Sequence, residues 1–162
     1  MSLEQETKSL LAVIRLRGTV NVNYKVRETL KMLRIEKTNY LTLIPKTATY
    51  LGMLKKAKDF ITWGEINKET LVHLLKKRGE LVGRKKLTDE YLKANTKYNS
   101  IEEFAEALYS GQATIDEIPN MKKCFRLHPA RKGYRSIKRN FGEGGDLGYR
   151  GEAINELIVR MA

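Results

Sequence analysis

The strongest constraint on the fold is a change of hydrophobic period between residues 10 and 66. Leu10, Ala12, Ile14 and Leu16 alternate with a second set of side chains, which is typical of a strand. The next apolar residues recur at helical spacing, and both patterns then repeat. The predicted elements are a strand at 10–17, a helix at 24–33, a strand at 40–44, a helix at 50–57 and a strand at 60–66.

This order predicts an α+β protein. Because each connecting helix must bury its apolar stripe, we expect helical crossovers packed on a small sheet. Residues 67–162 are predicted to be mostly helical. Their helices should begin after Asn67, Thr88 and the Ser100 capping box, and a last helix should span 151–161. The glycine-rich run 141–149 is predicted to be irregular.

We therefore divide the chain into a core at 1–66 and a helical elaboration at 67–162. The apolar C-terminal helix, residues 151–162, must dock on the rest of the protein, which makes the basic loop 120–140 a tethered segment. Like charges and glycines in that loop predict that it becomes ordered only on binding a partner.

Size and composition exclude several classes of protein. A chain of 162 residues buries a sizeable core without a disulfide or a metal. No apolar run approaches the ~20 residues that span a bilayer, and residues 1–8 lack the pattern of a secretory signal. The single cysteine, Cys124, fits a reducing cytoplasm. We expect a cytoplasmic protein with no membrane partner.

Charge is sharply segregated along the chain. The net charge is +12, and residues 119–139 hold eight lysines and arginines but no acid. The preceding residues 99–118 hold five acids and no base. A segment of this kind indicates a densely negative partner, of which a nucleic-acid backbone is the commonest. The alternative is a solvated basic loop.

The candidate RNA-binding residues fall into four groups. Arginines fork onto phosphates, and Tyr134 and His128 are candidates for stacking on unpaired bases. The helix start near Thr47 offers free N–H groups to phosphate, although Thr47 and Thr49 are alternatively plain caps. Arg15 and Arg17 lie either on an exposed sheet face or on a solvated edge. The full set is Arg15 and Arg17; Lys46, Thr47, Lys55 and Lys56; Arg84, Lys85 and Lys86; and Lys122, Lys123, Arg126, His128, Arg131, Lys132, Tyr134, Arg135, Lys138 and Arg139.

The sequence offers no convincing catalytic or metal site. Cys124 and His128 lack further ligands of the kind that zinc requires, and His73 is the only other histidine. The run 141–148 resembles a phosphate-binding loop only superficially, because it lacks the Lys-Ser/Thr ending. A hinge or a close approach of backbone to a partner explains its glycines better. We expect no cofactor, no metal and no enzymatic activity.

Several blocks of sequence resemble the large-subunit ribosomal protein thirty family, whose eukaryotic member is large-subunit protein seven. The resemblance runs from about Leu11 to Met161, and Tyr40 departs from the histidine or small polar residue usual at its place. The later blocks resemble the archaeal form. Eukaryotic members carry a long basic N-terminal extension, and its absence here also implies the archaeal form. The matching blocks are 13–18, 29–37, 43–45, 52–61, 62–65, 125–129 and 143–148.

The resemblance implies a βαβαβ core related to the ferredoxin-like class and a structural role in the large ribosomal subunit. It implies large-subunit (23S-type) ribosomal RNA as the ligand, neighbouring ribosomal proteins as partners, and one copy in each subunit. It also implies that the longer forms lie near the 5S ribosomal RNA. The residues alone leave two other classes open: a DNA- or RNA-binding regulatory module, and an enzyme acting on nucleic acid.

Overall fold

The computed structural model describes residues 10–18 and 20–162. A five-stranded sheet with the strand order β6-β2-β1-β3-β7 forms its centre, and a two-stranded hairpin lies apart from it. The strands are β1 (Leu10–Arg15), β2 (Tyr40–Pro45), β3 (Ile61–Glu65), β4 (Glu80–Leu81), β5 (Lys85–Lys86), β6 (Cys124–Arg126) and β7 (Gly148–Tyr149). The α-helices are α1 (Tyr24–Met32), α2 (Ala48–Lys56), α3 (Lys68–Arg78), α4 (Asp89–Asn95), α5 (Ile101–Tyr109) and α6 (Ile154–Met161).

The predicted α+β class and the strand-helix-strand-helix-strand order are confirmed. Both β2 and β3 run antiparallel to β1, which lies between them, so these two strands are parallel to each other. The connection through α2 is therefore a true crossover past β1. The expected crossover through α1 is wrong, because residues 33–39 bring the chain back to the same end of the sheet. There the Asn39 N–H donates to Arg15 O at 2.8 Å.

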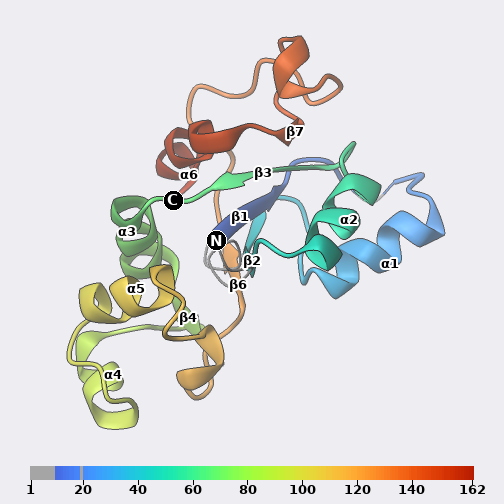
Figure 1. Cartoon of the computed structure of the whole chain (residues 1–162). Coiled ribbons are helices and arrows are strands. Elements are labelled where there is room, and N and C mark those ends of the chain that lie inside the picture. The colour runs from blue at the N-terminus through green and yellow to red at the C-terminus, as the bar shows by residue number, and fades with distance from the viewer. Residues whose placement is uncertain (1–9, 19) are drawn as a thin grey trace, which may run out of the picture.

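Helices α1 and α2 cover one face of the sheet (Figure 1). Leu11 and Val13 of β1 point to this side and are buried beneath Leu30 of α1 and Leu54 of α2. Burying each such side chain contributes about 1.5–3 kcal/mol. This small cluster fixes α2 over β1 and β3.

Helices α3, α5 and α6 pack on the opposite face, away from α1 and α2 in Figure 1. Ala12 and Ile14 of β1 point to this side. The last helix packs against the rest of the protein, and its Leu157, Ile158 and Met161 are fully buried. The sheet is therefore the middle of three layers, and residues on both sides of position 66 build it. The division of the chain at that residue stays a prediction.

The predicted helix starts are confirmed by their caps. The Asn67 and Thr88 side chains accept hydrogen bonds from Thr70 N and Tyr91 N at 2.7 and 3.2 Å. Ser100 accepts from Glu103 N at 3.2 Å, as a capping box requires. The extended pattern around Phe125 is also confirmed as an anchor, because it forms β6 and pairs with β2.

Two predicted loops contain short regular elements. Residues 141–149, expected to be irregular, include a 3₁₀ turn at Phe141–Glu143 and the strand β7, which runs parallel to β3. One glycine of this run allows a close approach within the chain itself, because a Cβ on Gly145 would lie 2.0 Å from Arg139 O. The basic loop at 83–86 is the tip and second strand of the β4–β5 hairpin.

Candidate nucleic-acid interface

Arg15 is not available to RNA, so the exposed-face interpretation is wrong for this residue. Its side chain is 1% exposed. The guanidinium donates to Arg17 O at 2.9 Å, to Ile35 O at 3.1 Å and to Glu36 O. Burial lowers the pKa of Arg15, and the nearby Glu36 opposes this. Arg15 therefore donates hydrogen bonds to backbone carbonyls at the point where the chain returns to the sheet. Arg17 is half-buried and packs over the Phe60 ring.

The start of α2 combines a cap with a neutralised lysine. Thr47 Oγ1 accepts a hydrogen bond from Tyr50 N at 3.3 Å, so the plain-cap alternative describes it. Lys46 Nζ lies 3.5 Å from a Glu65 carboxylate oxygen. Lys55 and Lys56, in the last turn of the same helix, are exposed. The available charge of α2 is thus at its C-terminal end.

We expect Thr47→Ala to lower the free energy of unfolding by about 1 kcal/mol, because an N-cap bond is lost. RNA affinity should stay unchanged, since the hydroxyl already has a backbone partner. Urea unfolding and RNA titration of the same sample measure both quantities. Thr49→Ala is the matched control and should cost no stability, because Thr49 is exposed within the helix. A loss of RNA affinity in Thr47→Ala alone would restore the phosphate-binding interpretation.

The structure pairs two of the predicted lysines with acids. Lys123 lies 2.5 Å from Asp116, and Lys122 lies 3.9 Å from Glu80. Hydrogen bonding to Lys123 lowers the pKa of Asp116. Exposed ion pairs of this kind add little stability, but they reduce the charge that is free to meet a phosphate.

Cations from separate elements converge on a groove at the β6 edge of the sheet, which we call the edge groove. It has a volume of about 430 Å³, and Glu80 is the only acid among the described residues that line it. Its cations come from the connection before β2, the end of α3, the hairpin strand β5 and β6. They are Lys37, Lys77, Arg78, Lys86 and Arg126.

Sequence reasoning identified only Lys86 and Arg126 of this set. Lys77 and Arg78 stand in the last turn of α3, where the negative end of the helix dipole favours basic residues by itself. No local pattern joins positions so far apart in the chain. The only available signal was the basic end of α3 followed by a basic hairpin.

Asp146 organises the basic loop. Its carboxylate accepts hydrogen bonds from Arg135 N and Ser136 N, the latter at 3.1 Å, and it pairs with Arg150 Nη2 at 3.0 Å. Both side chains of the ion pair are at most 4% exposed. Burial lowers the pKa of Arg150, and the hydrogen bond from Asp146 opposes that shift. The sequence predicted that the loop becomes ordered only on binding a partner. That prediction did not include this buried ion pair.

Of the two predicted stacking residues, Tyr134 is turned toward the protein, whereas His128 is half-buried and its contact is exposed. The Tyr134 hydroxyl lies 3.3 Å from Asn39 Oδ1, and burial raises the pKa of Tyr134. His128 Nδ1 lies 2.7 Å from Pro129 O. The cations of the loop, in contrast, face solvent. The exposed ones are Arg131, Lys132, Arg135, Lys138 and Arg139, together with Arg84 and Lys85 of the hairpin.

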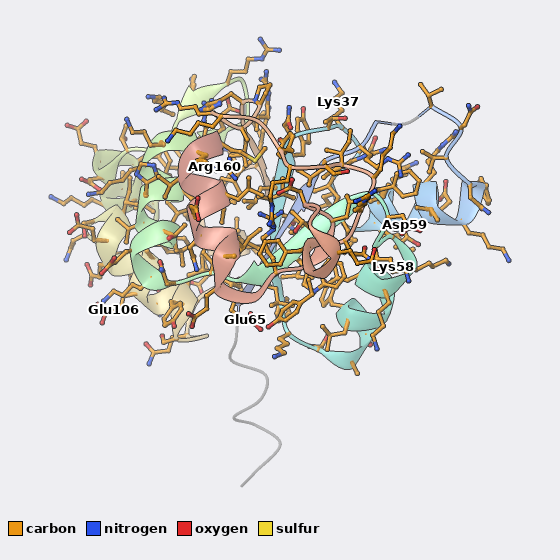
Figure 2. All side chains as sticks on the ribbon, turned by 90° about the horizontal axis from the view of Figure 1, so that it is seen from above. Lys37, Lys58, Asp59, Glu65, Glu106 and Arg160 are labelled. Carbon is orange, nitrogen blue, oxygen red and sulfur yellow. The ribbon has the colours of Figure 1, made fainter. Side chains whose placement is uncertain are left out.

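The acids of α5 lie on a different side of the molecule from the edge groove. Figure 2 shows Glu106 well separated from Lys37 and from Lys58. Glu102 pairs with Lys76 at 2.5 Å, and Glu106 pairs with Lys68 at 3.2 Å. The segregation of charge along the sequence therefore persists in space for the acids of α5, whereas Asp116 of the same acidic stretch pairs with Lys123 of the basic loop.

Within residues 10–18 and 20–162, no three metal-binding side chains gather at one place. In the same part of the chain, no helix has both the length and the apolar character needed to cross a bilayer.

Similarity to known proteins covers nearly the whole chain. The sequence profile of the ribosomal protein L30p/L7e family matches residues 11–61. The chain is 51% identical over 152 residues to a large ribosomal subunit protein uL30 of Archaeoglobus fulgidus, covering 94% of this chain and 99% of that relative. The protein of the same name from Nanoarchaeum equitans is 53% identical over 154 residues, with 94% and 98% covered. That of Methanoculleus marisnigri is 49% identical over 152 residues, with 94% and 99% covered.

Proposed function

The chain belongs to the ribosomal protein L30p/L7e family and is a structural, non-enzymatic component of the large ribosomal subunit, and from this premise we propose that it binds large-subunit ribosomal RNA through the edge groove and the basic loop. The family resemblance seen in the sequence is thereby confirmed, including its archaeal character.

The edge groove is the observation that carries this proposal. Its cations come from four parts of the chain and line one groove together with Glu80. Like charges repel, so this arrangement is stabilised by an anion that fills the groove. Its volume of about 430 Å³ admits a phosphodiester segment. Specificity should come from RNA shape and ribose hydroxyls more than from base edges.

The remaining partners are proposed from the family. We place one copy of the protein in each large subunit, in the cytoplasm, near the 5S ribosomal RNA and in contact with neighbouring ribosomal proteins. The relatives are named as proteins of the large ribosomal subunit, which supports this assignment. A regulatory module that binds DNA is the alternative, and a binding experiment separates the two.

The test is a titration of purified 23S-type RNA with the protein at increasing salt. We expect the affinity to fall steeply, by roughly 10³ to 10⁵ between 50 and 200 mM salt if about six to ten phosphates are neutralised. Replacing Lys37, Lys77 and Lys86 by alanine should reduce the slope of log affinity against log salt by about three.

A control triple variant changes the charge equally. Lys68, Lys76 and Lys123 are each paired with an acid, so replacing these three by alanine should change the slope much less. Equal slopes for the two triple variants would contradict a groove-specific contact. Tight, salt-resistant binding to a short DNA duplex would favour the regulatory module, and degradation of the RNA would favour an enzyme.

A further inference from the structure

An exposed arginine of the basic loop lies over an aromatic ring and lines a cavity. Arg135 Cζ lies 5.0 Å from the centroid of the Phe141 ring, and Arg135 Nη2 donates to Gly145 O at 3.2 Å. Arg150 Cζ lies 4.9 Å from the same centroid. The ring and one hydrogen bond therefore hold the Arg135 guanidinium in a fixed plane. Among the described residues no acid pairs with Arg135, and its side chain is exposed.

This guanidinium borders a cavity of about 460 Å³, which we call the loop pocket. Its wall also includes Lys132, Phe141, Glu156 and Arg160. Figure 2 shows Arg160 on α6, and Glu156 and Arg160 of this helix line the pocket. The volume lies within the range of about 300–1,000 Å³ that is usual for small-molecule sites. A single nucleobase is small enough to enter it.

Arg160 is a fixed part of the pocket wall. Its Nη1 donates to Arg131 O and Gly133 O at 3.2 and 3.0 Å. Its Nε is buried and is not accessible to a ligand in the pocket, whereas the Glu156 side chain is 80% exposed and offers a carboxylate acceptor at the wall.

We propose that Arg135 is a stacking platform for one unpaired base of ribosomal RNA, which lies against the guanidinium in the loop pocket. Planar guanidinium groups stack on unpaired bases. The Glu156 carboxylate offers an acceptor for an exocyclic amino group. The base that fits carries such a group, as adenine and cytosine do. Glu156 would repel a phosphate in the same place, which favours a base over a backbone contact.

This inference rests on the proposed binding of ribosomal RNA and assigns a different contact to Arg135 than simple charge neutralisation. Arg135→Lys separates stacking from charge neutralisation, because lysine keeps the positive charge but lacks the planar guanidinium group. Lys138→Ala is the control, since Lys138 is an exposed cation of the same loop and would contact phosphate only.

The test uses 23S-type and 5S RNA from Archaeoglobus fulgidus, with and without protein, under dimethyl sulfate. This reagent methylates adenine N1 and cytosine N3 when they are unpaired. The unsubstituted protein should protect a discrete unpaired adenine or cytosine, and Arg135→Lys should leave that base reactive. Affinity should fall about five-fold or more with an unchanged salt slope, because stacking and not charge is lost. Lys138→Ala should lower the salt slope by about one and keep the protection.

Two outcomes would overturn the inference while sparing the proposed function. One is unaltered protection and affinity in Arg135→Lys. The other is a footprint without any protected unpaired base, although the protein binds tightly. Failure of the unsubstituted protein to bind either RNA would instead refute the proposed function, and the stacking site with it.

Discussion

Asp146→Ala should lower the free energy of unfolding by about 3–5 kcal/mol, measured by urea denaturation. The substitution leaves the Arg150 guanidinium buried without a counter-charge, and removing one partner of such a pair is far more costly than removing both. It also leaves Arg135 N and Ser136 N without an acceptor. Amide hydrogen exchange should therefore become faster in residues 131–140 before the rest of the chain.

The control is Asp116→Ala, which removes a fully exposed partner of Lys123 and should leave the unfolding midpoint unchanged. The double variant Asp146→Ala, Arg150→Met should recover part of the loss, because an apolar side chain then replaces the unpaired charge. An unchanged midpoint in Asp146→Ala would show that this ion pair does not hold the loop.

Replacing Arg126, Arg131, Lys132 and Arg135 together by alanine should abolish stable incorporation into large subunits while the fold stays intact. A hydrogen bond to a charged group contributes about 1.5–3 kcal/mol, so each lost contact costs roughly ten-fold in affinity. Allowing for non-additivity, we expect at least about a 10³-fold loss for the set. Co-sedimentation with the subunit in a sucrose gradient, and titration of 23S-type RNA, measure the effect.

The matched control removes the same charge from the acidic side of the molecule. Lys68, Lys76, Lys93 and Lys97 lie on or beside α3 and α4, and replacing them by alanine should leave co-sedimentation normal. Circular dichroism of both variants checks that the fold survives. Normal co-sedimentation of the loop variant would contradict the role proposed for the basic loop.

Much of the fold was predictable because the controlling interactions are local. The alternation of Leu11 and Val13 with Ala12 and Ile14 gave β1 its two apolar faces, and both faces are buried. The caps at Asn67 and Ser100 were evident from side chains next to the helix starts. Strand β7 was not evident, because its pairing depends on two glycines distant in the chain, Gly64 and Gly151, passing close to each other.

The candidate site was predictable in composition but not in arrangement. A run of cations identified the basic loop, yet charge alone did not reveal that Arg15 is buried or that Tyr134 faces inward. Those outcomes depend on carbonyls and side chains supplied by distant segments, such as Ile35 O and Asn39. The edge groove is the same case: Lys37 and Lys77 meet only after the chain has folded.

The three-layer order has a consequence for how a ribosome synthesises this chain. The strands β1, β2 and β3 and their covering helices α1 and α2 emerge first, but Ala12 and Ile14 on the opposite face are covered only after α3, α5 and α6 have left the exit tunnel. A nascent chain therefore presents a bare apolar surface for most of its elongation. Arrested nascent chains that end before α6 should bind ribosome-associated chaperones, whereas the full-length protein should not. The nascent chain would then depend on chaperones during its synthesis.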